Sequence, residues 1–159
     1  MKRKVYIETS VVSYLTARPS KNVIEAGHQQ STYEFWDRRD EFDLFASELV
    51  LTECAGGDPE AASKRLAALR DIKLLDITPY SIELAKDLVT AGIVPPKASE
   101  DVLHISIATV HFADYLLTWN CRHIANPEIQ ARIAENFRYK GLFLPFICTP
   151  EELMGGESE

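Results

Sequence analysis

The sequence is poor in cysteine. Its 159 residues include three cysteines, Cys54, Cys121 and Cys148, and no two of them have the spacing of a CxxC motif. An odd number of scattered thiols supports neither a disulfide framework nor a zinc site. We therefore expect reduced thiols, in keeping with a cytoplasmic protein.

Long apolar runs are also missing. No segment approaches the roughly 18 consecutive apolar residues of a membrane-spanning helix. Basic residues at 2–4 precede apolar ones, as in a signal peptide, but Glu8, Thr9 and Ser10 interrupt the apolar run and no small-residue cleavage site follows. The sequence thus predicts a soluble protein without a membrane partner.

Basic residues are outnumbered by acidic ones. The chain has 17 lysines and arginines against 24 aspartates and glutamates, a formal net charge of −7. This balance argues against a protein that coats nucleic acid by bulk charge, although a nuclease with a local basic rim around an acidic metal site remains compatible with it. Phosphate-binding motifs of the GxGxxG and GxxxxGK[ST] kinds are absent as well, which disfavours the nucleotide-binding enzymes that use them.

What the sequence does contain is an alternation of short apolar runs and helical patterns. The runs at 4–8, 43–47, 72–77, 115–117 and 143–148 predict strands, and Pro145 favours a sheet edge for the last. Helical patterns lie between them, the longest over 22–42. Residues 1–150 are therefore predicted to form one three-layer α/β domain, in which helices flank a central, mostly parallel sheet of four to five strands. Residues 151–159 are predicted to be a flexible acidic tail.

Several helix starts carry a capping residue. Ser99 is expected to cap a buried helix whose first turn holds Asp101, because the helix dipole favours negative charge there. Thr149 and Glu152 have the spacing of a capping box and predict a final helical turn. Asp101 is thus an acid at a helix start that packing should hold in place.

Four oxygen-bearing side chains are expected to meet at one edge of the sheet. Glu8 and Asn120 follow strands, and right-handed crossovers bring the carboxyl ends of parallel strands to the same edge. Glu53 and Asp101 lie in helices that can lean over that edge. Convergent carboxylates repel one another unless a cation lies between them, and such hard oxygen ligands suit Mg²⁺ or Mn²⁺. Taken singly, each of the four also has a plainer interpretation, as a strand-end charge, an exposed helix position, a helix-start charge or a turn residue.

Four segments carry a family resemblance, namely residues 5–15, 47–53, 101–108 and 115–120. In their order and spacing they resemble the PIN-domain ribonucleases, in particular the VapC-type toxins of bacterial toxin–antitoxin pairs, over roughly residues 4 to 148. That family usually has Asp-Thr/Ser-Ser in the first segment, Glu in the second, Asp opening the third and Thr-x-Asp in the fourth. This chain departs from the pattern twice, because Glu8 replaces the first Asp and Asn120 replaces the last acid.

The resemblance implies a PIN-like fold and a set of site residues. Glu8, Glu53, Asp101 and Asn120 become the catalytic and metal-binding residues, and Thr9, Ser10 and Thr118 are expected to orient these ligands or water. The implied activity is endoribonucleolytic hydrolysis of RNA phosphodiester bonds with Mg²⁺, or Mn²⁺, as the cofactor. The implied partners are the RNA substrate, a second copy of the chain in a homodimer, and a cognate antitoxin.

Histidine and tryptophan residues near these segments leave alternatives open. His104 lies one turn beyond Asp101 and is predicted either to bond an acidic ligand or to be a core histidine. A zinc site made of His104, His111 and His123 lacks a recognised spacing. Trp119, beside Asn120, is suited either to base contacts or to packing, and Arg122 and His123 offer contacts to bases or phosphates.

The neutral Asn120 opens a second hypothesis about function. Losing one negative charge weakens cation binding, so the main alternative is a catalytically weak PIN-like module that binds RNA or a protein partner. A third hypothesis is a metallophosphatase that hydrolyses small phosphate esters instead of RNA.

Overall fold

The structure is a computed structural model and describes residues 1–155. Its elements follow one another in the order β1 (Lys4–Ile7), α1 (Thr9–Thr16), α2 (Val23–Asp37), η1 (Arg39–Glu41), β2 (Asp43–Ser47), α3 (Glu48–Cys54), α4 (Pro59–Ala68), β3 (Lys73–Leu75), α5 (Pro79–Thr90), η2 (Pro96–Ala98), α6 (Ser99–Val110), β4 (Tyr115–Leu117), α7 (Pro127–Tyr139), β5 (Phe146–Cys148) and α8 (Pro150–Met154). The five strands predicted from the sequence are all present.

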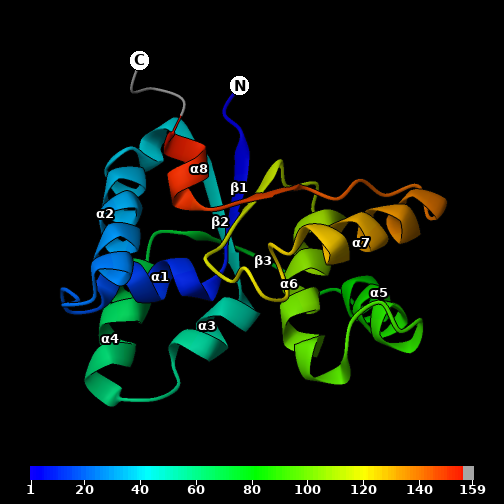
Figure 1. Ribbon diagram of the computed structural model, residues 1–159, viewed down its shortest axis with the longest axis horizontal. Coiled ribbons are helices and arrows are strands. Elements are labelled where there is room, and N and C mark those ends of the chain that lie inside the picture. The colour runs from blue at the N-terminus through cyan, green and yellow to red at the C-terminus, as the bar shows by residue number, and fades with distance from the viewer. Residues whose placement is uncertain (156–159) are drawn as a thin grey trace.

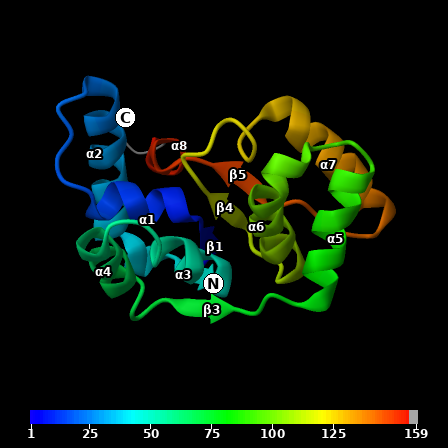
Figure 2. The ribbon, with the colours of Figure 1, turned by 90° about the horizontal axis from the view of Figure 1, so that it is seen from below.

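The sheet is parallel throughout and lies between two layers of helices. Its strand order is β3-β2-β1-β4-β5, and every neighbouring pair runs parallel. Helices α1 to α4 lie on one side of the sheet and α5 to α7 on the other, as both views show (Figure 1 and Figure 2). The predicted fold class, a three-layer α/β domain with a parallel sheet of up to five strands, is confirmed.

Strand β1 lies at the centre of the sheet because it is apolar on both faces. Val5, Tyr6 and Ile7 are completely buried, the pattern of a strand covered by helices on either side. β1 pairs with β2 through Val5 and Leu44 and with β4 through Ile7 and Leu117. The residues that follow these strands therefore emerge side by side at one edge of the sheet.

Helix α6 forms much of the core on its side of the sheet. Val102, Ile105, Ile107 and Ala108 are fully buried, so apolar residues cover most of the helix circumference, as expected for a helix enclosed by other elements. Its partner α5 packs against it. This packing fixes the start of α6 at the sheet edge where the strands end.

The predicted start of α6 is wrong in detail. Ser99 does not cap the helix but is its first residue, with helical backbone angles (φ −56°, ψ −43°), and its hydroxyl donates to the carbonyl oxygen of Pro96 at 2.5 Å. The cause is η2, a 3₁₀ turn that leads directly into α6, so that the capping position falls on Ala98. Asp101 still lies in the first turn.

Other boundaries also differ from the sequence-based prediction: the strands expected over 72–77 and 143–148 are shortened to Lys73–Leu75 and Phe146–Cys148. The helix predicted over 22–42 ends at Asp37 and is followed by η1, whose turn is closed by the ion pair between Arg38 and Glu41 at 2.7 Å. Residues 151–154, predicted to belong to the tail, form part of α8, which the capping box of Thr149 and Glu152 begins and which packs against α2. The rest of that predicted tail, 156–159, lies outside the described residues.

Within residues 1–155, no helix combines the length and the apolar character that crossing a membrane requires.

Candidate functional site

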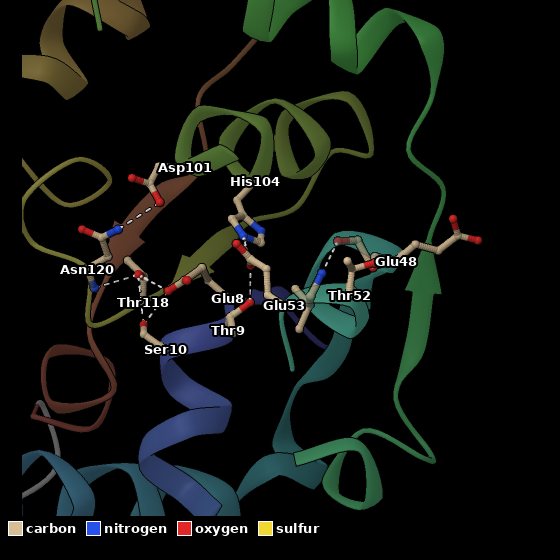
Figure 3. A network of polar contacts seen from close by, with 12 residues as sticks. Glu8, Thr9, Ser10, Glu48, Thr52, Glu53, Asp101, His104, Thr118 and Asn120 are labelled. Carbon is tan, nitrogen blue, oxygen red and sulfur yellow. Dashed lines mark hydrogen bonds and ion pairs between the residues drawn. The ribbon is translucent and has the colours of Figure 1, made fainter. Parts of the chain in front are cut away.

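Side chains from four separate elements meet where the central strands end. Glu8 follows β1 directly, Thr118 follows β4, Glu53 lies on α3 and His104 on α6. Figure 3 shows these side chains pointing toward one another across the edge of the sheet. The chain thus brings together groups that are up to 110 positions apart in sequence.

Glu8 is a nearly buried carboxylate held by two hydroxyl groups. Its residue is 5% exposed, and its Oε1 atom accepts hydrogen bonds from Ser10 at 2.5 Å and from Thr118 at 2.6 Å. Both hydroxyls in turn accept backbone N–H groups, Ser10 from Trp119 and Thr118 from Asn120, which directs their protons toward Glu8. Because both donors bind Oε1, they leave the second oxygen, Oε2, available to a cation.

Glu53 is a second carboxylate, held from the other side. Its Oε1 accepts hydrogen bonds from the Thr9 hydroxyl at 2.5 Å and from Nε2 of His104 at 2.7 Å. Partial burial raises the pKa of Glu53, because it disfavours the charged carboxylate. The hydrogen bond and charge of His104, together with the hydrogen bond from Thr9, outweigh this effect and hold the pKa below its ordinary value. Glu53 is therefore ionised at neutral pH.

Behind Glu53, a chain of buried polar groups supports His104. The His104 residue is fully buried, and its Nδ1 lies 2.7 Å from the hydroxyl of Tyr6, which lies 2.8 Å from the Ser47 hydroxyl. Burial, opposed by the bond to Ser47 and reinforced by the charges of Glu8 and Glu53, raises the pKa of Tyr6 well above its ordinary value. Tyr6 therefore stays protonated and offers His104 a hydroxyl that can both donate and accept.

These groups form a donor set that fits a divalent cation. Ligand atoms of Glu8, Glu53 and His104 all lie within 4.8 Å of one another. Neighbouring carboxylates in such a set repel each other, and a cation between them removes the repulsion. Carboxylate oxygens with one imidazole nitrogen are ligands that several divalent metals accept.

Asp101 and Asn120 lie beside this set at the same edge and bond to each other (Figure 3). The amide nitrogen of Asn120 donates to Oδ1 of Asp101 at 3.2 Å, and Nδ1 of His123 lies 2.9 Å from Oδ2. The amide oxygen of Asn120 accepts the backbone N–H groups of Arg122 and His123, each at 3.2 Å. The carbonyl that we expected to serve as a ligand thus closes its own turn, and Asn120 presents donors to Asp101.

The remaining predicted residues also reach the site. Thr9, Ser10 and Thr118 bond Glu53 or Glu8, and His104 makes the bond to an acid that was one of its two expected roles while also being a core histidine. Glu48, the other acid of α3, points away from the site (Figure 3).

Sequence reasoning missed Tyr6, Ser47 and the contact between His123 and Asp101. A tyrosine inside an otherwise aliphatic strand was the available signal, because a buried tyrosine hydroxyl needs a hydrogen-bond partner.

Trp119 packs against neighbouring residues, since its ring stacks on His28 with centroids 4.0 Å apart and its Nε1 donates to Thr32 at 2.9 Å.

Comparisons with known proteins give a fold and no sequence family. No protein-family model matches the chain. A search of curated proteins likewise finds no similar sequence. Among solved structures, the chain is similar to one in the crystal structure of VapBC2 from Rickettsia felis bound to a DNA fragment from their promoter, with 17% identity and a TM-score of 0.58. The match covers 92% of this chain and 98% of the other. The chain thus shares the three-layer fold of that protein, in keeping with the PIN-like fold that the sequence motifs had indicated.

Proposed function

We propose that this protein is a metal-dependent endoribonuclease of the VapC type, which hydrolyses RNA phosphodiester bonds at the edge formed by Glu8, Glu53 and Asp101. The observation that carries the proposal is the pair of carboxylates, Glu8 and Glu53, held together by dedicated hydroxyl and imidazole donors. Such an arrangement costs free energy through repulsion unless a cation is bound. The VapC-like fold supports the same activity.

Each polar residue has a role in this proposal. Glu8, Glu53 and Asp101 would hold Mg²⁺, with Mn²⁺ as an alternative, and the bound cation would polarise the scissile phosphate and assist the attack of water. Ser10 and Thr118 orient Glu8, and Thr9 orients Glu53. Asn120 is the fourth site residue and acts by positioning Asp101 through its amide donor.

A second candidate function follows from Asn120. The hydrogen bond from its side-chain amide nitrogen occupies Oδ1 of Asp101, and His123 contacts Oδ2. Both contacts reduce the negative charge that Asp101 offers to a cation. A catalytically weak PIN-like module that binds RNA or a protein is the function this observation favours. A metal titration distinguishes the nuclease from the binding module, because the module is expected to bind no Mg²⁺ or Mn²⁺ at millimolar concentrations.

The proposed partner, assembly and location rest on the fold comparison and on the family resemblance of the sequence motifs. The similar structure is described as VapBC2 bound to a DNA fragment from their promoter. By analogy with that complex, we propose a cognate antitoxin as the protein partner of this chain. On the family resemblance of the sequence motifs, we propose a homodimer as its assembled form and the cytoplasm as its location.

The test compares two acids of helix α3. Calorimetric titration with Mg²⁺ and with Mn²⁺, and cleavage of labelled RNA with and without EDTA, are measured for the wild type, Glu53→Gln and Glu48→Gln. We expect binding and EDTA-sensitive cleavage in the wild type and in Glu48→Gln, whose side chain is exposed and points away, and loss of both in Glu53→Gln. A wild type that binds metal but cleaves only small phosphate esters would indicate a phosphatase.

A further inference from the structure

We propose that His104 is itself a metal ligand, binding the divalent cation through Nε2 beside the carboxylates of Glu8 and Glu53. The inference rests on the proposed function and specifies the ligand set and the preferred cation of that same site.

The position of Nε2 meets the requirement for a ligand. It lies 2.7 Å from Oε1 of Glu53, and ligand atoms of all three residues lie within 4.8 Å of one another. Two neighbouring ligands at about 2.1 Å from a metal and at right angles lie about 3 Å apart. The separation between Nε2 and Oε1 therefore suits a hydrogen bond when the cation is absent and a pair of adjacent ligands when it is bound.

The Tyr6 hydroxyl can satisfy the hydrogen bonding of Nδ1 of His104 both with and without a bound metal. When the imidazole is neutral and no metal is bound, Nε2 can donate its proton to Glu53 while Nδ1 accepts the hydroxyl proton of Tyr6. With metal, the proton is on Nδ1 and donated to the Tyr6 oxygen, and Tyr6 donates to Ser47, 2.8 Å away. A metal-binding histidine usually donates its other ring nitrogen to such a partner.

Packing holds the His104 ring in the orientation that a ligand needs. The residue is fully buried, and its ring lies against that of Tyr6 with centroids 5.8 Å apart. Asn120, in contrast, has its amide oxygen bonded to two backbone N–H groups. His104 is thus better placed than Asn120 to supply the neutral ligand of the site.

The identity of the ligand predicts a preference among cations. Mg²⁺ is bound mainly by oxygen atoms, whereas an imidazole favours divalent transition metals. With His104 in the ligand set, the site should bind Mn²⁺ more tightly than Mg²⁺.

The direct test is electron spin-echo spectroscopy of Mn²⁺ bound to the full chain. We expect modulation from a directly coordinated ¹⁴N nucleus in the wild type, and the same modulation in His123→Gln. The second variant is needed because His123 lies at the same edge, on Asp101. Bound Mn²⁺ without a directly coordinated nitrogen, or a nitrogen signal that disappears in His123→Gln, overturns the inference and leaves the nuclease proposal standing. Failure of millimolar Mn²⁺ and Mg²⁺ to bind overturns both.

A variant of His104 gives a second readout. In His104→Gln, whose fold is checked by circular dichroism, the affinity for Mn²⁺ should fall about tenfold or more while the affinity for Mg²⁺ changes much less. Equal losses for both cations contradict a direct ligand, because they would mean that His104 only orients Glu53. If His104→Gln does not fold, the spectra of the wild type and of His123→Gln still show whether His104 is a direct ligand.

Discussion

Thr118 donates its hydroxyl to Glu8 across 2.6 Å, although 110 positions separate the two residues. The bond exists because each residue follows one of two adjacent parallel strands, β4 and β1, which end together. Thr118 also accepts the backbone N–H group of Asn120, so its orientation is fixed before any cation binds. The same contact therefore joins distant parts of the chain and holds the Glu8 carboxylate in one orientation.

Replacing Thr118 by valine should destabilise the protein. The change keeps the side-chain shape but removes one of the two donors to the buried Glu8 and the acceptor of the Asn120 N–H group. We expect a loss of about 1–3 kcal/mol in the free energy of unfolding, measured by urea denaturation in EDTA. Thr52→Val is the matched control, because Thr52 is exposed and bonds only the carbonyl of Glu48 within its own helix, so its change should stay within about 0.5 kcal/mol. Equal effects would mean that the bond to Glu8 contributes nothing.

Replacing Glu8 by glutamine should separate stability from metal binding. The amide oxygen can still accept from Ser10 and Thr118, while the repulsion with Glu53 is removed. In EDTA, the melting temperature should therefore equal or exceed that of the wild type. Mn²⁺ at about 100 times its dissociation constant should stabilise the wild type by about 2.7 kcal/mol and leave Glu8→Gln unchanged. Thermal unfolding with and without Mn²⁺ measures this, and an undiminished response in Glu8→Gln would exclude Glu8 as a ligand.

The pKa of Glu53 predicts a pH dependence of stability. This pKa lies below its ordinary value of 4.5, so the folded state binds fewer protons than the unfolded one near that pH. The contribution of Glu53 is fully present above the ordinary pKa and is lost as the pH falls through the lower pKa of the folded state. Urea midpoints in EDTA should therefore differ most between wild type and Glu53→Gln near neutral pH and converge as the pH falls below 4.5. A difference that stays constant over this range would contradict the assignment.

Most of the fold could be predicted from short sequence patterns, because these patterns are set locally. Residues 5–7 and 116–117 are continuous apolar runs, and a strand buried on both faces needs such a run. The polar residues Glu8 and Asn120, which come shortly after these runs, were then predicted to share an edge from the parallel connection alone. The start of α6 was wrong because the 3₁₀ turn at Pro96 determines which residue takes the capping position.

The details of the site depend on relations that no local pattern contains. Tyr6 reaches Ser47 because the strand order places β1 beside β2, and it reaches His104 because the tertiary fold brings α6 against β1. The orientation of Asn120 depends on the turn after it, whose N–H groups bind the amide oxygen and turn the amide nitrogen toward Asp101. Residue identity therefore predicted which groups gather, and tertiary geometry determined which atoms they present.

Replacing Asn120 by aspartate, the residue usual at this position in the family that the sequence resembles, should make the site depend more strongly on a cation. The amide nitrogen that bonds Asp101 at 3.2 Å would become a carboxylate oxygen, so two negative charges would face each other. We expect lower stability in EDTA, tighter binding of Mn²⁺ and Mg²⁺ by calorimetry, and faster RNA cleavage. Asn22→Asp adds the same charge at the exposed cap of α2, where either residue accepts the helix N–H groups, and should change none of these. If Asn120→Asp behaves like Asn22→Asp, Asn120 has no part in the site, and the neutral residue cannot be the reason for any weakness in metal binding.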